Sequence, residues 1–90
     1  MLFMSVFTFS PDKRNEVIRR RQEGPKLSKG TKLIGEWAVI GKNMVYRLFE
    51  TEDPKAMLDG TSSWTDIGDI HVDPVIDSEE MMNLFRGMKR

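Results

Sequence analysis

The chain has 90 residues and no cysteine, and its 14 basic and 14 acidic side chains cancel to a formal net charge of zero. This length predicts a single domain over residues 1–90, and the absence of thiols excludes disulfides and cysteine-ligated metals, so packing must stabilise the fold. A neutral total argues against a nucleic-acid-binding protein, although the charges are sorted: residues 1–33 hold eight basic and three acidic side chains, and residues 50–80 hold one and ten.

Residues 1–9, "MLFMSVFTF", predict a strand that is covered on both sides, because apolar residues occupy both of its alternating faces. The run is far shorter than the ~20 residues that span a bilayer, and it lacks a basic segment and a cleavage site. We therefore expect a soluble, cytoplasmic protein that makes no membrane contact.

A helix is expected over residues 10–24, with Ser10 as N-cap and Gly24 as the stop. Its "RRR" at residues 19–21 predicts a solvated face and not a phosphate-binding patch, because consecutive helical residues point about 100° apart. The loop "PKLSKGT" that follows lacks the spacing of a phosphate-binding loop.

"KLIGEWAVI" and "MVYRLFET" flank the short turn "GKN", which is a hairpin pattern. If Gly and Lys of that turn are its two central residues, Trp37 lies opposite Tyr46, and Glu36 lies opposite Arg47. Both pairs are then cross-strand neighbours.

Asp53 and Pro54 predict the start of a short second helix, with Met57, Thr61 and Trp64 on one face. "DIGDIHVDPVI" predicts the last strand, and Pro74 within it favours the edge of the sheet, because proline cannot donate to a ladder. A final helix is expected after a capping-box pattern at residues 77–80. Its apolar residues recur at helical spacing: Met81, Leu84, Phe85 and Met88.

The order β-α-β-β-α-β plus a terminal helix predicts an α+β, ferredoxin-like fold, in which both helices cover one face of a four-stranded antiparallel sheet. An antiparallel sheet with one wet face should alternate cleanly between apolar and polar residues. The first three strands do not, so the open face would carry an apolar patch of the size that marks an interface. We expect a homodimer formed through that open face.

The chain resembles the domain-of-unknown-function family numbered 3303, within the dimeric α/β-barrel superfamily. The resemblance covers nearly the whole chain, in "MLFMSVFTF", "GPKLSKGTKLIGEW", "RLFETEDPKAM" and the segment from "SSW" to "VDPV". It implies a ferredoxin-like homodimer, and it places the chain near cofactor-independent monooxygenases, muconolactone isomerase-like enzymes and haem-binding proteins. No catalytic residue comes with the resemblance.

Two groups of residues are candidates for binding a ligand on the hairpin. Glu36 and Arg47 are charges that the pattern places among apolar neighbours on their own face: Ile34, Ala38, Val45 and Phe49. They form either a structural ion pair or a site in which the arginine fork holds a ligand's carboxylate or enolate. Trp37 and Tyr46 either stack on an aromatic ligand or belong to the core.

His71 is the only histidine, and Asp69 and Asp73 flank it at a spacing that puts all three on one strand face. A carboxylate could orient the imidazole as a general base, so His71 is a further candidate for the ligand-binding site. The apolar residues between them favour a face toward solvent or the rim, where His71 would be a contact and His71→Ala would leave ligand binding intact. One histidine without cysteine predicts no metal site, and no motif indicates a cofactor.

Two functions fit these observations. The first is a homodimeric α/β-barrel protein that binds a small anionic or aromatic metabolite between sheet and helices. The alternative is a non-catalytic structural or regulatory dimer whose second sheet face is purely interface. No nucleophile elbow or similar motif is present, so the sequence leaves open whether the protein is an enzyme.

Overall fold

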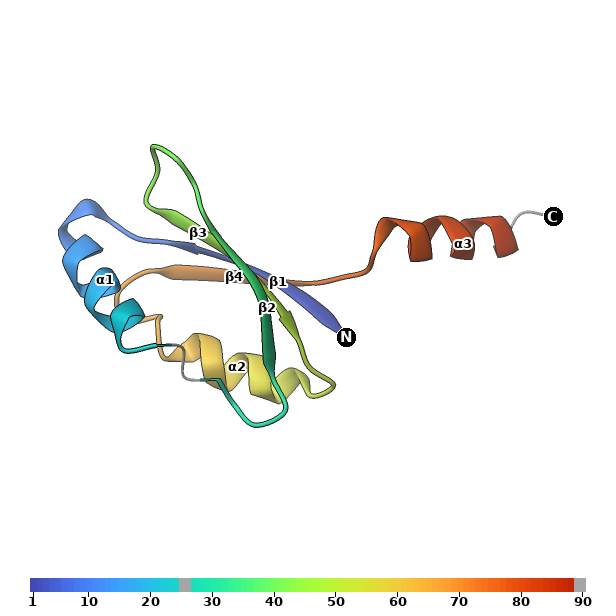
Figure 1. The fold of residues 1–90 in the computed structure, drawn as a ribbon, viewed down its shortest axis with the longest axis horizontal. Coiled ribbons are helices and arrows are strands. Elements are labelled where there is room, and N and C mark those ends of the chain that lie inside the picture. The colour runs from blue at the N-terminus through green and yellow to red at the C-terminus, as the bar shows by residue number, and fades with distance from the viewer. Residues whose placement is uncertain (25–26, 89–90) are drawn as a thin grey trace.

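The computed structural model describes residues 1–24 and 27–88. Figure 1 shows helices beside the sheet and a C-terminal helix that projects from the body. The strands are β1 (Leu2–Thr8), β2 (Lys32–Ala38), β3 (Met44–Glu50) and β4 (Asp69–Val75). The helices are α1 (Arg14–Gln22), which follows a 3-10 turn at Pro11–Lys13, α2 (Pro54–Ser62) and α3 (Ser78–Met88).

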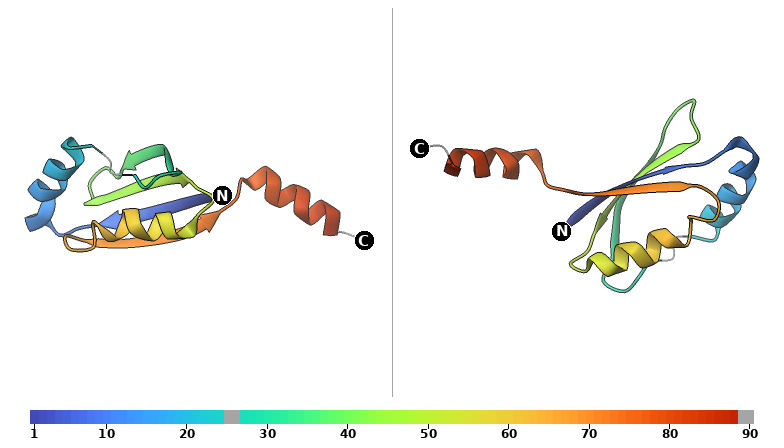
Figure 2. Two further views of the ribbon diagram at one scale, coloured as in Figure 1. Left: turned by 90° about the horizontal axis from the view of Figure 1, so that it is seen from below. Right: turned by 180° about the vertical axis from the view of Figure 1, so that it is seen from behind.

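The strands form one antiparallel sheet in the order β2-β3-β1-β4. This is the predicted α+β, ferredoxin-like architecture, and it is confirmed. Strand β4, which contains Pro74, lies at the edge as expected. The two views of Figure 2 show that α1 and α2 lie on the same side of the sheet.

Local signals begin α2 and end α1 where the sequence indicates. The expected start of the first helix is wrong, because Ser10 makes no side-chain capping hydrogen bond and precedes a 3-10 turn, and α1 begins only at Arg14. The Asp53 carboxylate accepts a hydrogen bond from the backbone N–H of Lys55 at 3.0 Å, and Pro54 occupies the first position of α2. Gly24, with φ of +92°, follows α1 in the left-handed region that ends helices. The loop predicted after Gly24 starts with residues 25 and 26, which lie outside the described residues.

The hairpin has the predicted register, with Trp37 opposite Tyr46 and Glu36 opposite Arg47. One expectation is wrong: Ile34 does not share a face with Glu36. A β-bulge between Leu33 and Gly35 inserts one residue, so Leu33 turns toward the helices, and the bulged Ile34 is half exposed.

The face covered by the helices carries two small apolar clusters. Phe3, Phe49 and Met57 form one, with Leu33 and Val72 packed against it. The other joins β1 to α1 and to the segment before β4, and it comprises Phe7, Val17 and Ile67, with Phe9, Trp64 and Ile70 around it.

A polar row crosses the sheet between these clusters. Ser5 of β1 pairs with Arg47 of β3, and Arg47 pairs with Glu36 of β2. Ser5 is buried, at 4% exposure, on the same alternating face as Phe3 and Phe7. The core is therefore interrupted at its centre by one hydroxyl and two charged groups.

The opposite face of the sheet is open, and it is apolar over β1, β2 and β3, where Val6, Tyr46 and Trp37 form one row across the strands. Helix α3 covers none of it, because the chain runs outward from β4 through residues 76 and 77 (Figures 1 and 2). Within the described part of the chain, no helix combines the length and apolar character needed to cross a membrane.

Candidate functional site

A cavity lies between the covered face of the sheet, α2 and the loop over residues 27–31. Its volume is about 40 Å³, counted as the space open to the centres of water molecules. Since one water needs roughly 10–15 Å³ on this measure, the cavity holds about three waters or one compact group. Its apolar walls are Phe7, Leu27, Leu33, Phe49, Ala56, Met57, Trp64 and Ile70.

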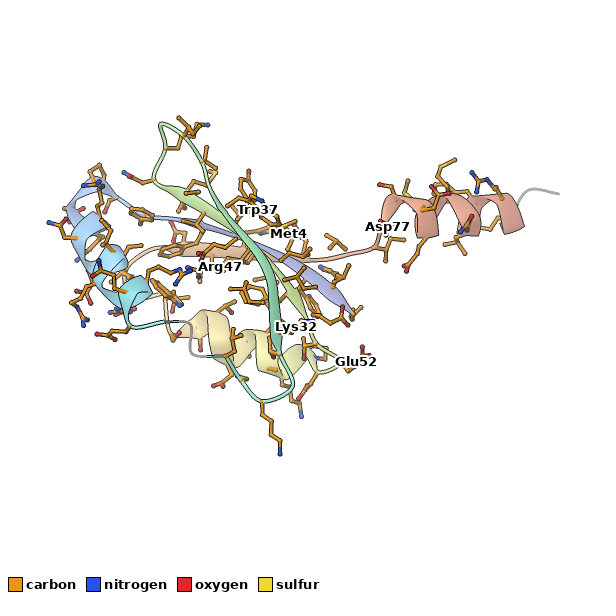
Figure 3. The ribbon with its side chains drawn as sticks, in the orientation of Figure 1. Met4, Lys32, Trp37, Arg47, Glu52 and Asp77 are labelled. Carbon is orange, nitrogen blue, oxygen red and sulfur yellow. The ribbon has the colours of Figure 1, made fainter. Side chains whose placement is uncertain are left out.

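The polar row of the sheet reaches this cavity, because Ser5, Glu36 and Arg47 all line it. Glu36 binds two arginines: its Oε2 accepts from Arg47 Nε at 2.6 Å, and its Oε1 accepts from Arg21 Nε at 2.7 Å. The side chains of Arg47 and Glu36 are only 12% and 21% exposed. Figure 3 shows Arg47 on the side of the sheet that faces α1 and α2.

The two arginines keep Glu36 ionised. Burial alone would raise the pKa of the Glu36 carboxyl, but the hydrogen bonds from Arg21 and Arg47 outweigh burial and hold this pKa below its ordinary value. Two guanidinium groups therefore face one carboxylate, and the cluster keeps one surplus positive charge in a half-buried setting.

Arg47 has hydrogen-bonding capacity to spare. A guanidinium carries five N–H donors, and Glu36 occupies only the one on Nε. Within residues 1–24 and 27–88, no hydrogen bond engages the two terminal nitrogens of Arg47. The guanidinium carbon lies 5.0 Å from the ring centre of Trp64, in cation–π geometry, which fixes the plane of the fork.

Two hydroxyl groups add polar capacity to the cavity. Thr31 lines it, and the buried Oγ1 of this residue has no hydrogen-bond partner among the described residues. Ser5, paired with Arg47 across the strands, lines the same space. A buried polar group without a partner is costly, so Thr31 favours a neighbour that supplies a hydrogen bond.

The other hairpin candidates lie elsewhere. Trp37 and Tyr46 are neighbours on the open face and do not line the cavity. Trp37 is 53% exposed, and its ring lies over Gly35, where an added Cβ would come within 2.4 Å of the ring. Glu36 and Arg47 thus converge on one site, while Trp37 and Tyr46 belong to the opposite surface.

His71 also lies away from the cavity. It pairs with Val6 in the register, and it shares the open face with Asp69 and Asp73, as the alternation predicts. Its Nε2 is 2.9 Å from Asp73 Oδ2, and the imidazole is 72% exposed. Among the described residues, no group of three or more potential metal ligands gathers.

The three consecutive arginines of α1 point in different directions. Arg19 and Arg20 both bind Glu16 within the helix, Arg20 also binds Asp66 at 2.6 Å, and Arg21 reaches Glu36. They form no common patch, in agreement with the prediction. Sequence reasoning nevertheless missed that Arg21 belongs to the Glu36 cluster, because this contact depends on how α1 docks onto the sheet.

Ser5 and Thr31 were also missed. Ser5 left a signal, since it is the one polar residue between Phe3 and Phe7 on an otherwise apolar strand face. The sequence gives no signal for Thr31, because this residue lies in a loop whose path depends on tertiary contacts. One of them is the 2.6 Å hydrogen bond from Ser28 to Asp59 of α2.

Comparison with known proteins gives one finding. No curated protein and no solved structure matches the chain. One family model does, and it matches residues 1–89, which confirms the family part of the resemblance seen in the sequence. The chain belongs to the family described as "Domain of unknown function (DUF3303)".

Proposed function

We propose that this protein binds a small anionic ligand with an apolar or aromatic part, in the cavity between the sheet and the helices, and that it does so as a homodimer formed through the open sheet face. The observation that carries the proposal is the polar row of Ser5, Arg47 and Glu36 in the middle of the covered face. Placement in the dimeric α/β-barrel superfamily is part of the same proposal, supported by the ferredoxin-like topology and the apolar open face.

Arg47 is the group that would hold the anion. Its unused terminal N–H groups can donate two parallel hydrogen bonds to a carboxylate, and the surplus positive charge of the cluster favours an anion there. Glu36 fixes the guanidinium through Nε, and Trp64 fixes its plane. The site is thus arranged before a ligand arrives, which lowers the entropy cost of binding.

The walls define the rest of the ligand. Trp64, Met57 and Phe49 offer aromatic and apolar contact, and the hydroxyl of Thr31 can hydrogen-bond an oxygen substituent. A volume of about 40 Å³ admits only a compact molecule. A larger ligand requires the loop over residues 27–31 to move away from α2. At present the Ser28 hydroxyl donates a hydrogen bond to Asp59 of α2 and holds the loop there.

A thermal-shift and calorimetric titration tests the proposal with benzoate, succinate and inorganic phosphate as probes. Benzoate is larger than the cavity, so its binding also requires the loop over residues 27–31 to move. We expect benzoate to raise the melting temperature of the wild type and to lose this effect in Arg47→Gln. Arg19→Gln is the matched control, since it removes the same charge from the exposed face of α1. If none of the three probes binds at millimolar concentration, or if Arg47→Gln binds as the wild type does, the proposal fails.

One observation favours the alternative of a structural or regulatory dimer. The cavity is much smaller than the roughly 300–1,000 Å³ of ordinary small-molecule sites. In that case the cluster is a structural ion-pair network, and water fills the space. Absence of binding by all three probes, together with an intact dimer, would support this function.

A further inference from the structure

We infer that α3 is an exchanged arm, and that its apolar stripe packs on the open sheet face of a second copy of the chain. The stripe consists of Met81, Leu84, Phe85 and Met88, which occupy one side of the helix and are between 37% and 65% exposed. This inference rests on the dimer part of the proposed function, and it adds the element that would hold the two copies together.

No other element of residues 1–24 and 27–88 covers this stripe. The hydrogen bonds of α3 stay within the helix and its cap: the Asp77 carboxylate accepts from the backbone N–H of Glu79, and Arg86 donates to Asn83. Figures 1 and 2 show α3 well outside the body in all three views. An 11-residue helix with this much apolar surface is marginal alone in water, so it needs a surface to pack on.

The dimensions of the chain show how much surface is unpartnered. The accessible area is 6717 Å², whereas a compact monomer of this mass exposes about 5,400 Å². The radius of gyration is 15.4 Å, whereas a compact chain of this length has about 12 Å. The excess of roughly 1,300 Å² exceeds the ~800 Å² that each partner buries in a standard interface.

The open sheet face has the shape and chemistry to receive the helix. Its apolar part spans β2, β3 and β1, about 14 Å across at ~4.8 Å per strand, and a helix is ~10 Å wide. Strand β4 completes this face with Asp69, His71 and Asp73, which need no apolar cover.

A second copy is the partner that the chain itself specifies. Each chain has one apolar stripe and one apolar sheet face, and a two-fold axis pairs each stripe with the other copy's face in a closed assembly. A different protein in that place would leave one of the two surfaces exposed.

Light scattering on four full-length variants tests the arm. We expect the wild type at 50 µM to show twice the chain mass of 10.4 kDa, and Phe85→Glu and Trp37→Glu to show the single mass. Asn83→Glu is the matched control on the polar side of α3, and Ile40→Glu, at the hairpin tip and 99% exposed, is the control for the sheet. Both controls should remain dimers, and far-UV circular dichroism should show every variant folded.

Each other outcome overturns the inference in a recognisable way. A monomeric wild type overturns the dimer as well as the arm. A dimer that survives Phe85→Glu but not Trp37→Glu overturns the arm and leaves a dimer through the sheets alone. A dimer that survives Trp37→Glu but not Phe85→Glu shows that α3 docks elsewhere and overturns the receiving face.

Cross-linking gives a second readout that does not depend on how the glutamate variants fold. The chain has no cysteine, so Leu84→Cys and Leu48→Cys each introduce a single thiol, on α3 and at the centre of the open face. Mixing the two variants under mild oxidation should give a disulfide-linked heterodimer. Replacing Leu84→Cys by Asn83→Cys should abolish it, and equal cross-linking by both would contradict the proposed contact.

Discussion

Removing both charges of the Glu36–Arg47 pair should destabilise the protein far less than removing either one. Glu36→Leu leaves Arg47, 12% exposed, beside Arg21 without a counter-ion. We expect a loss of about 2–3 kcal/mol, at or just below the ~3–5 kcal/mol of a broken buried pair, because this pair keeps some contact with solvent. Arg47→Met keeps the stem and leaves Glu36 bound to Arg21, so the loss is one charge-assisted hydrogen bond and one cation–π contact, about 2 kcal/mol.

The double variant Glu36→Leu/Arg47→Met has an apolar row in that place, and we expect its stability to lie within about 1 kcal/mol of the wild type. The coupling energy is then about 3 kcal/mol. Urea unfolding followed by circular dichroism measures it, at one fixed protein concentration, because any dimer makes stability depend on concentration. Losses that add to within about 0.5 kcal/mol would refute the reasoning, since the pair would then behave as an exposed one.

Three further predictions follow from the structure. The folded-state pKa of Glu36 lies below its ordinary value of 4.5, so the stability that ionised Glu36 contributes is present above pH 4.5 and is lost as the pH falls below it. The urea midpoint should therefore fall more steeply below pH 4.5 in the wild type than in Glu36→Leu/Arg47→Met. Equal slopes in the two proteins would contradict this. Asp53→Ala removes the N-cap of α2 and should cost about 1 kcal/mol, or roughly 4–8 °C in melting temperature, measured by calorimetry; an unchanged value would show that the cap is not needed. His71→Ala should leave benzoate binding unchanged in a calorimetric titration, since His71 is on the side of the sheet opposite the cavity, and a weaker affinity would contradict this placement.

The hairpin shows what could be predicted from sequence and what could not. Its register follows from local features, namely two β-rich runs and a turn with Gly41 at φ of +82°. The bulge at Ile34 was missed although Gly35 is a signal for it: an isolated glycine in a strand pattern often marks a bulge, but it does not say which neighbour is the extra residue. The error is confined to Leu33 and Ile34, since alternation resumes after the bulge and returns Glu36 to the predicted pairing with Arg47.

The candidate site was predicted in part for the same physical reason. The cross-strand pair Glu36 and Arg47 follows from hairpin geometry, and it holds in the structure. Arg21 and Thr31 join the site only after α1 and the loop dock on the sheet, and no local pattern encodes those long-range contacts. Helix α3 is a similar case: its 3.6-residue periodicity predicts an apolar stripe, but periodicity does not say which surface the stripe will meet.

The polar row also separates the two proposed functions on energetic grounds. Ser5, Arg47 and Glu36 divide a small core into two clusters of three buried residues each, in a domain whose length already makes a single core marginal. If stability alone shaped this face, apolar residues across the row would join the clusters and remove the cost of desolvating two charges. A dimer that uses only its open face gains nothing from polar groups on the covered one. A site that must hold an anion beside an apolar wall does gain from them, because the buried arginine that weakens the core is also the group that would bind the ligand.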